Sequence, residues 1–450
     1  MSNNQFTTFF EEMQEKFLWN IMWFVPLGFP SPVLLIQLSP RIIRHECNCC
    51  GHGCTYIHEH DNRTIKGGTI LGVPIIYEME TIRYKCARCR ITFFVEYDCI
   101  PALRSTTTET ENYIIWQLGS APMSHIAAEI GVSVQTVANR AKAFGASEKK
   151  IMLKGRYTYL SMDEIYAGRD KDNRQVYYWA LNDISVPWKA NNIMLEIGRT
   201  KDKVVERLMK LEHRDKVKAI SIDMCEYYRD AILLALPHVI IVVDRFHVIK
   251  NATERMNDVR KRVNCTKKDY DAMKEDAALF LKSFYKLDNS ELARLESYLK
   301  LDTQLESMYY IVQDLLELYF VRGYDEALEF LCRWESKVLE SGVDEAAALY
   351  KTVYNWLPYI INFFCYRITN GKTEGKNNLI RQILSMGYNY GLASLQGCLY
   401  AHDRRQEYTK WKRFQKKAES TKATATSTKR KKPRRTRIAN SQDRSSKTVA

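Results

Sequence analysis

Apolar and polar positions in the middle of the chain alternate in short runs, as in β-strands joined by helices. Three apolar runs come first. A charged stretch with helical spacing follows, and then two further apolar runs on either side of a short helical segment. The predicted order is strand, strand, strand, helix, strand, helix, strand, at 157–162, 175–181, 192–197, 201–214, 217–222, 227–236 and 239–243. This order predicts an RNase H-like fold, in which a three-stranded meander is extended by parallel strands through helical crossovers.

Acidic residues directly follow several of these apolar runs. We predict that Asp163 ends the first strand and Asp223 the fourth. These strands are neighbours in the predicted topology, so the two carboxylates should converge. A later helix carries Glu374 with Asn378 and Arg381 on the same face. Three such carboxylates suit Mg²⁺ or Mn²⁺, because two divalent ions about 4 Å apart can activate an attacking oxygen and stabilise a leaving oxygen in phosphodiester transfer.

The same acids also have structural explanations. Asp223 and Asp244 are placed to cap the helices that follow them, and Glu374 to complement a helix dipole in its first turn. The combination at matching topological positions favours catalysis for Asp163, Asp223 and Glu374. For Asp244, the capping and the catalytic interpretations stay equally open.

Cysteines cluster near the N-terminus in two C-x-x-C pairs. Cys47 and Cys50 form the first pair, Cys86 and Cys89 the second, and 35 residues separate the pairs. Four thiolates at this spacing close a tetrahedral structural zinc site. The alternating, β-branched run between the pairs suits the strands of a zinc ribbon. Further potential ligands stand nearby, at Cys49, His52 and Cys54.

The segment 123–145 has the pattern of a helix-turn-helix. Gly131 stands where a tight turn needs a left-handed residue, and Ser133 suits the N-cap of a second helix, on which Val137 and Ala141 face inward. We predict that the outward side chains contact DNA, namely Gln135, Thr136, Asn139, Arg140 and Lys142. An ordinary helical hairpin is the alternative, since amphipathic spacing alone does not distinguish the two.

Positive charge is concentrated at the C-terminal end. From Trp411 onward, fourteen Lys and Arg stand against two Asp and Glu, so this segment carries +12 of the net +14. The run at 428–437 has no apolar periodicity, and we expect it to be disordered. It is either a merely solvated run or an arm that raises nonspecific DNA affinity in a salt-dependent way.

The remaining composition indicates a reduced, non-membrane protein. Six of the twelve cysteines lie between Cys47 and Cys89, and no secretory signal pattern precedes them, so we expect reduced thiols rather than disulfides. The apolar stretch at 17–38 is interrupted by prolines and a glycine, which favours a strand or packing arm over a membrane span. We expect a cytoplasmic, nucleoid-associated location.

Together these motifs resemble the ISL-three family of bacterial insertion-sequence DDE transposases over roughly residues 40–405. Besides the ribbon and the helix-turn-helix, four stretches carry the resemblance: SMDEIYAGRD (161–170), SIDMCEYYRDAI (221–232), VVDRFHVIKNA (242–252) and TNGKTEGKNNLIRQIL (369–384). The family pattern implies catalytic roles for Asp163, Asp223 and Glu374. It also implies that Asp244 and His247 belong to a Cys/Asp-x-x-His motif beside the active site.

The resemblance explains the long interval between Asp223 and Glu374 as an all-helical insertion at about 250–368. Within it, Trp334 and Trp356 are either core residues or, for one of them, a surface that steadies an unpaired base. We also expect that three cations clamp phosphates, namely Arg245, Lys376 and Arg381.

The sequence therefore predicts a multidomain α/β protein. Its expected parts are an N-terminal arm (1–37), a zinc ribbon (38–104), a helix-turn-helix domain (105–150), an RNase H-like domain with its helical insertion (155–405), and a basic tail (406–450). The predicted function is binding of the terminal inverted repeats of an insertion sequence, with metal-dependent strand cleavage and strand transfer by a homo-oligomer on double-stranded DNA. A catalytically silent DNA-binding regulator and an RNase H-like nuclease are the alternatives.

Overall fold

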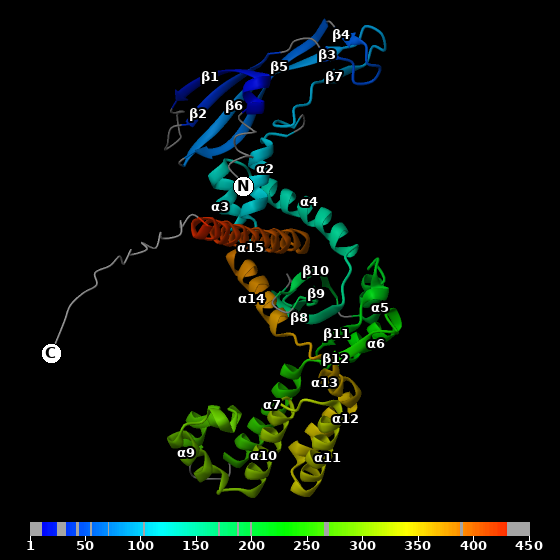
Figure 1. Ribbon diagram of the computed structural model, residues 1–450, viewed down its shortest axis with the longest axis vertical. Helices are drawn as coiled ribbons and strands as arrows, with labels where there is room; N and C mark the ends of the chain where they lie inside the picture. The colour runs from blue at the N-terminus through cyan, green and yellow to red at the C-terminus, as the bar shows by residue number, and fades with distance from the viewer. Residues whose placement is uncertain are drawn as a thin grey trace, which may run out of the picture. The chain divides into compact units, whose positions relative to one another are not determined.

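The computed structural model describes most of the chain (Figure 1), namely residues 11–24, 33–41, 45–54, 56–70, 72–101, 104–169, 172–186, 189–198, 200–264, 270–387 and 390–429. The chain divides by its internal contacts into Met1–Ala401 and His402–Ala450, and each unit is described by itself. Within the described ranges, no helix is both long enough and apolar enough to cross a membrane.

The first part of the chain forms a mixed sheet of five strands. The strands run in the order β1 (Phe17–Phe24), β2 (Val33–Pro40), β6 (Val73–Lys85) and β5 (Tyr56–Ile70), with β7 (Thr92–Phe94) also paired to β6. In its described parts, the apolar stretch at 17–38 is thus a pair of antiparallel strands, which confirms the strand interpretation. Phe17, Ile65 and Tyr77 are buried in the core of this sheet.

Three helices follow the sheet, namely α2 (Thr108–Gln117), α3 (Met123–Ile130) and α4 (Val134–Leu153). Gly131 has a φ of +75°, the left-handed conformation expected for the turn between α3 and α4. The Ser133 hydroxyl accepts the backbone N–H of Thr136 at 3.1 Å and caps α4. Val137 and Ala141 are buried as predicted. The two helices and the turn between them are therefore present as predicted, and α4 extends beyond the predicted segment.

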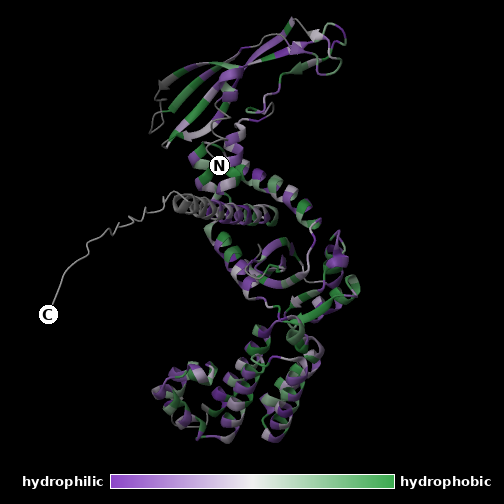
Figure 2. Cartoon of the chain, viewed as in Figure 1, coloured by the Kyte–Doolittle hydropathy of each residue, from purple (hydrophilic) through white to green (hydrophobic). Residues whose placement is uncertain are grey.

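The central sheet has the predicted strands. Its order is β10 (Asn191–Ile197), β9 (Gln175–Asp183), β8 (Tyr159–Arg169), β11 (Ala219–Ile222) and β12 (Ile240–Val243). The first three strands are antiparallel, and β11 and β12 are parallel to β8. Helices α5 (Lys201–Leu208) and α6 (Glu226–Ala235) supply the crossovers. Figure 2 shows the largely hydrophobic colouring of β11 and β12, as expected of strands buried on both faces.

One boundary in this sheet differs from the prediction. Asp163 does not end the first strand, because β8 continues to Arg169. The reason is that β8 has two different neighbours. Residues Tyr159 to Ser161 of β8 pair in parallel with β11, whereas the antiparallel pairing of β8 with β9 continues through Arg169. Asp163 therefore lies two residues past the last β8 residue paired with β11, in the middle of its own strand.

Between 250 and 368 the described residues form helices joined by short loops. The elements of the predicted insertion are α7 (Arg245–Asn264), α8 (Tyr270–Glu275), the short 3-10 helices η2 (Asp276–Leu281) and η3 (Phe284–Lys286), α9 (Asn289–Leu299), α10 (Thr303–Leu318), α11 (Tyr324–Ser341), α12 (Asp344–Ile361) and α13 (Phe363–Tyr366). The insertion starts earlier than expected, since α7 begins directly after Asp244. One hydrophobic core joins these helices to the sheet, and Asn362 Nδ2 donates to the β12 carbonyl of Ile241 at 2.9 Å.

The other face of the sheet packs against helices from both ends of the domain. Ile165, Tyr178 and Leu195 share a buried cluster with residues of α2, α3 and α4 and with two late helices, α14 (Gly371–Met386) and α15 (Leu392–Lys429). The helices α2, α3 and α4 and the central sheet therefore share one core. This arrangement fixes α4 against the element that follows the predicted catalytic helix.

A glycine pair allows α4 and α15 to approach closely. A Cβ on Gly397 would lie 2.1 Å from the Ala141 carbonyl oxygen, and one on Gly145 would lie 2.9 Å from the Gly397 nitrogen. Real Cβ atoms do not tolerate such distances from backbone, so both positions require glycine.

The second unit continues α15 from His402 to Lys429. The first part of the predicted basic tail, 406–429, is therefore helical. Most of the segment expected to be disordered, 430–437, lies outside the described residues.

Candidate active site

The four paired cysteines form a compact cluster. Cys47, Cys50, Cys86 and Cys89 present sulfur atoms that all lie within 4.8 Å of one another. Two of the sulfur–sulfur distances are 3.5 Å (Cys47 to Cys89) and 3.7 Å (Cys50 to Cys86). Tetrahedral zinc with bonds of about 2.3 Å separates its sulfur ligands by about 3.8 Å. The cluster therefore has the dimensions of a structural zinc site, as predicted.

Two equivalent backbone turns shape this cluster. The N–H of Gly51 donates to Cys47 O at 2.8 Å, and the N–H of Arg90 donates to Cys86 O at 3.0 Å. Both residues have positive φ, +65° and +61°. The backbone N–H of Cys89 lies 3.4 Å from Cys86 Sγ and lowers the pKa of Cys86 to about 6. That thiol is thus poised to be a thiolate at neutral pH, which is the form that binds metal.

The alternative ligands stand apart from this group. Cys49 is exposed, and neither Cys49 nor His52 belongs to the cluster. The side chain of Cys54 lies outside the described residues. The C-x-x-C spacing alone therefore distinguished the four cysteines of the cluster from the other potential ligands nearby.

A second site is a cavity of about 650 Å³ at the carboxyl ends of the central parallel strands. Asp163 of β8, Asp244 after β12 and Glu374 of α14 line it. The insertion supplies the opposite wall through Ser283, Lys286, Leu316, Tyr319 and Phe320. Residues more than 200 positions apart in the sequence therefore share one cavity.

Asp163 is buried and held by two hydrogen bonds. Its side chain is on the face of β8 that packs against α14, and Asn377 Nδ2 donates to Asp163 Oδ2 at 2.7 Å. The backbone N–H of Glu164 donates to its other oxygen at 2.8 Å. Burial raises the pKa of Asp163, and the Glu374 carboxylate adds to the rise, while His247 and the hydrogen bonds oppose it.

Asp223 follows the last residue of β11. The register that pairs Ser221 with Ser161 makes Asp223 level with Asp163 if it is continued by two residues. Among the described residues, however, Asp223 is not part of the cavity lining. Its charge acts at the start of α6, where burial, and then Asp223, raise the pKa of Cys225 to about 11. Two of the three predicted catalytic acids thus line the cavity, and Asp223 follows β11, the strand that pairs with the Asp163 strand β8.

Glu374 is engaged with a cation of its own helix. Arg381 Nη1 donates to Glu374 Oε1 at 3.1 Å and to Asn378 Oδ1 at 2.6 Å. The predicted shared face is therefore present. The Glu374 side chain is 53% exposed, so this ion pair is partly hydrated and weak.

The acids suit a divalent ion in kind but are not gathered into a closed site. Carboxylate oxygens are the ligands that Mg²⁺ and Mn²⁺ prefer, and the buried Asp163 lies in one cavity with Glu374. Within the described part of the chain, only the cysteine cluster brings three or more ligand atoms within 4.8 Å. Holding an ion would require Glu374 to turn from Arg381 toward Asp163.

Asp244 joins two helices. The backbone N–H of Asn370, at the start of α14, donates to Asp244 Oδ1 at 3.2 Å. Burial raises the pKa of Asp244, and the N–H groups of Asn370 and Phe246 oppose the rise. Because it also lines the cavity with His247, Asp244 has features of both interpretations left open by the sequence.

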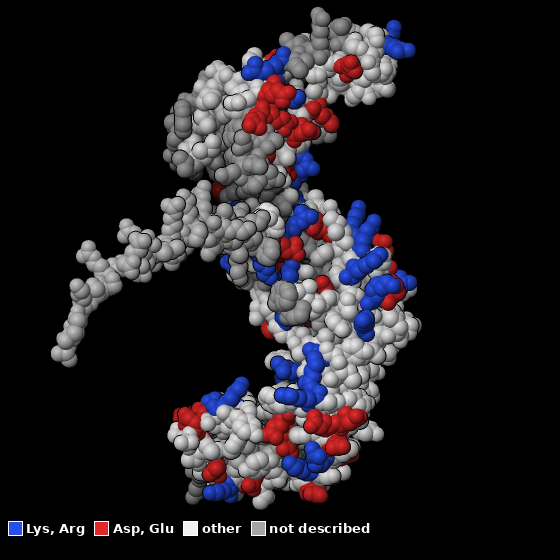
Figure 3. All heavy atoms as spheres, in the orientation of Figure 1, with Lys and Arg blue, Asp and Glu red and all other residues white. Residues whose placement is uncertain are grey.

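The predicted DNA-contacting residues of α4 differ in their availability. Gln135, Asn139 and Lys142 are exposed, and Thr136 is half-buried. Arg140 is ion-paired with Glu111 of α2, which also binds Arg104 at 3.0 Å. In Figure 3, Lys and Arg side chains gather over the region of α4 and α5.

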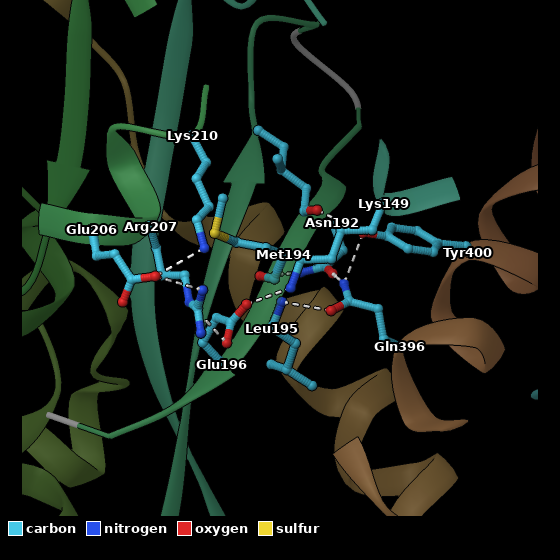
Figure 4. A network of polar contacts seen from close by, with 11 residues as sticks. Lys149, Asn192, Met194, Leu195, Glu196, Glu206, Arg207, Lys210, Gln396 and Tyr400 are labelled. Carbon is cyan, nitrogen blue, oxygen red and sulfur yellow. Dashed lines mark hydrogen bonds and ion pairs between the residues drawn. The ribbon is translucent and has the colours of Figure 1, made fainter. Parts of the chain in front are cut away.

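A polar network that the sequence did not reveal ties α4 to the edge of the central sheet (Figure 4). Glu196 on β10 is paired with Lys149 of α4 and with Arg207 of α5, the latter at 3.3 Å. Gln396 of α15 accepts the backbone N–H of Leu195 at 3.1 Å. Partners so far apart in sequence leave no local signal.

For the two tryptophans of the insertion, the structure confirms the core interpretation. Trp334 and Trp356 are buried, and Trp334 Nε1 donates to Ile311 O at 3.0 Å, so both are core residues. The cavity is instead lined by Phe246 and Phe320, which are 61% and 79% exposed. Of the expected clamps, Arg245 lines the cavity and Arg381 pairs with Glu374, whereas Lys376 is buried.

Comparison with known proteins agrees with the resemblance seen in the sequence. Residues 160–397 match the ISL3 model of DDE transposases, which is described as "Transposase". The "Transposase for insertion sequence element IS1001" of Bordetella parapertussis is 23% identical over 368 residues, which cover 80% of this chain and 89% of that protein.

A solved structure titled "Drosophila P element transposase strand transfer complex" aligns with 65% of this chain and 91% of its own chain. The identity is 12% and the TM-score 0.36, too low to support an argument about this chain. The family model, by contrast, spans more than half of the 450 residues. This chain therefore belongs to the ISL3 family of DDE transposases.

Proposed function

We propose that the chain cleaves DNA at the terminal inverted repeats of its insertion sequence and transfers the released strand to a target. The observation that carries this proposal is the cavity shared by Asp163, Asp244 and Glu374 in a member of a transposase family. Three elements far apart in sequence converge there, and two of the predicted catalytic acids are among the lining residues.

Asp163, Asp223 and Glu374 would hold Mg²⁺ or Mn²⁺. A divalent pair bound there supplies Lewis-acid stabilisation of the attacking and leaving oxygens. The chain's own contribution is to orient the ligands. Asn377 fixes one oxygen of Asp163, and the N–H of Glu164 fixes the other. Burial of the Asp163 carboxyl favours its neutralisation, either by a proton or by a cation.

The proposed chemistry has two steps. In the first, a water oxygen attacks phosphorus, the bond from phosphorus to the 3′-oxygen breaks, and the 3′-oxygen leaves as a hydroxyl with a 5′-phosphate on the other side. In the second, this 3′-hydroxyl attacks a target phosphodiester and displaces the target's 3′-oxygen, which takes up the proton. No covalent protein–DNA bond is needed in either step.

DNA recognition is assigned to the N-terminal half. The exposed Gln135, Asn139 and Lys142 of α4 are placed to read base edges and phosphates, and the zinc ribbon would hold further duplex. The common core of α4, α15 and the central sheet supports coupling between DNA reading and cleavage. Two ends must be held at once, so we propose a homo-oligomer on double-stranded DNA.

A strand-cleavage assay on duplexes from the two ends of the encoding element tests the proposal. Wild type should nick at the element boundary with Mg²⁺, and Asp223→Ala should not, although it should still bind DNA. Equal product from both proteins would remove the catalytic assignment. Binding to matched inverted ends without any cleavage would favour the silent regulator, and cleavage of RNA–DNA hybrids without end binding would favour the nuclease.

A further inference from the structure

Two helices begin at the same wall of the acidic cavity. The α7 residues Arg245, Phe246 and His247 line it, and so do Asn370 and Gly371 at the start of α14. Asp244 holds the two starts together, since it directly precedes α7 and its Oδ1 accepts the N–H of Asn370 at 3.2 Å. Both helices are long, with 20 and 16 residues. The positive dipole ends of both helices therefore converge on the cavity, where the N–H groups of Asn370 and Phe246 donate to Asp244.

Asn370 carries an unused side-chain amide at this point. The residue is only 3% exposed, and within the described structure neither Nδ2 nor Oδ1 has a hydrogen-bond partner. A buried amide that makes no hydrogen bond destabilises the folded state, so such groups are rare unless something outside the protein satisfies them. An amide that lines a cavity can be satisfied by a ligand in that cavity.

Helix capping does not account for this side chain. Asn370 is the N-cap residue of α14, a position where asparagine ordinarily accepts an N–H from the first turn. No such hydrogen bond is present. The backbone N–H of Asn370 donates to Asp244, and the Asn370 side-chain amide remains available to a ligand.

We propose that the Asn370 Nδ2 and the N-termini of α7 and α14 form a binding site for a phosphate of the DNA strand. This inference rests on the proposed function and adds a contact that the three acids do not provide. Arg245 and Lys286 line the same cavity and supply positive charge. A helix N-terminus favours anions over cations, so the amide at this end is assigned to phosphate rather than to the metal.

The first test measures phosphate binding without DNA. Inorganic phosphate, compared with chloride at equal ionic strength, should raise the unfolding midpoint of wild type and of Gln382→Ala, a control amide that is exposed on α14 outside the cavity lining. In Asn370→Ala most of that rise should be lost, while the midpoint without phosphate stays near that of wild type, because no side-chain hydrogen bond is removed. An undiminished rise in Asn370→Ala overturns the proposal. If this variant does not fold, Asn370→Asp keeps the shape but removes the donor and takes its place.

The second test asks whether the phosphate belongs to the reacting strand. A duplex of the element end carries either the natural phosphate or an uncharged methylphosphonate at the cleavage position, and Ca²⁺ replaces Mg²⁺ so that binding is measured without cleavage. Asn370→Ala should weaken binding to the natural duplex about tenfold and to the methylphosphonate duplex less than about twofold, because a hydrogen bond to a charged group is lost only in the first. Equal losses overturn the assignment.

These tests separate the inference from the proposed function. If wild type cleaves its ends and the phosphate response of Asn370→Ala is normal, only the Asn370 site is wrong. If wild type never cleaves, the proposed function fails, whatever the phosphate titration gives.

Discussion

The chain contains two candidate metal sites that are built in opposite ways. The cysteine cluster is complete before any ion is present, with all four sulfur atoms within 4.8 Å. The acidic cavity is not, since the described residues show no comparable group of carboxylates there, and Glu374 is paired with Arg381 instead.

Electrostatics explains the difference. A cluster of thiols can lie close together because some of them keep a proton at neutral pH, and the two cysteine turns are set by local backbone hydrogen bonds. Carboxylates brought equally close would repel unless one took up a proton or a cation arrived. Burial is the largest cause of the raised pKa of Asp163, and the Glu374 carboxylate adds to the rise. A site that is closed in advance suits a permanent structural ion, and a site that closes on its ion suits one that must exchange ligands during a reaction.

The largest expected effect is loss of the cysteine cluster. Cys86→Ser should abolish zinc binding and unfold the segment between the two cysteine pairs, because structural zinc contributes roughly 10 kcal/mol or more of binding free energy. Elemental analysis and limited proteolysis would measure both consequences. Cys49→Ser is the matched control, since Cys49 is exposed and outside the cluster. Zinc loss in the control as well would contradict the ligand assignment.

Removal of one acid should have the next largest effect, and only on the other site. Asp163→Ala should lower the cleavage rate about 10³-fold or more, because several kcal/mol of transition-state stabilisation depend on the bound ions. Its zinc content should be unchanged. Asp215→Ala removes an exposed acid that pairs with Lys216 at 2.9 Å, and it should cleave normally. A cleavage rate for Asp163→Ala close to that of Asp215→Ala would show that the cavity is not the active centre.

The third effect concerns stability and pH. Because burial raises the pKa of Asp163 in the folded state, the folded protein binds this proton more tightly than the unfolded chain. Raising the pH from the ordinary range of an aspartate through the raised pKa should therefore destabilise the magnesium-free protein. Asp163→Asn, which keeps the shape, should raise the unfolding midpoint by a few degrees at neutral pH and by less in acid.

Thermal unfolding in magnesium-free buffer without chelator, which leaves zinc in place, measures this third effect. Addition of Mg²⁺ should stabilise wild type and not the variant. A difference between the two proteins that does not depend on pH would mean that the Asp163 charge is not the cause.

The smallest effect should come from the ion pair that competes for Glu374. Arg381→Gln frees this carboxylate and should tighten Mn²⁺ binding about twofold, since a partly exposed pair is worth about 0.5 kcal/mol. Mn²⁺ titration followed by electron paramagnetic resonance would detect the change. Arg174→Gln, which breaks the exposed pair with Asp172, is the control. Weaker Mn²⁺ binding in Arg381→Gln would mean that Arg381 positions Glu374 for the ion.

Local patterns were enough for much of the fold. The left-handed Gly131, the cap at Ser133 and each C-x-x-C pair depend on residues near one another in sequence, and the strand order was predicted from the order of the apolar runs. The length of β8 could not be predicted in this way. Strand β8 continues past Asp163 because it pairs there with β9, beyond the residues that pair with β11.

The sequence by itself determined the elements, their order and the cysteine site, because periodicity, turns and paired thiols act over a few residues. Only the tertiary structure decided that α4 touches α15 through Gly145 and Gly397. It likewise decided that the buried Asn370 side chain has no hydrogen-bond partner among the described residues and that Phe320 of the insertion lines the same cavity as the acids. These features depend on residues from about 50 to about 250 positions apart, and long-range packing leaves no periodic trace in a single sequence.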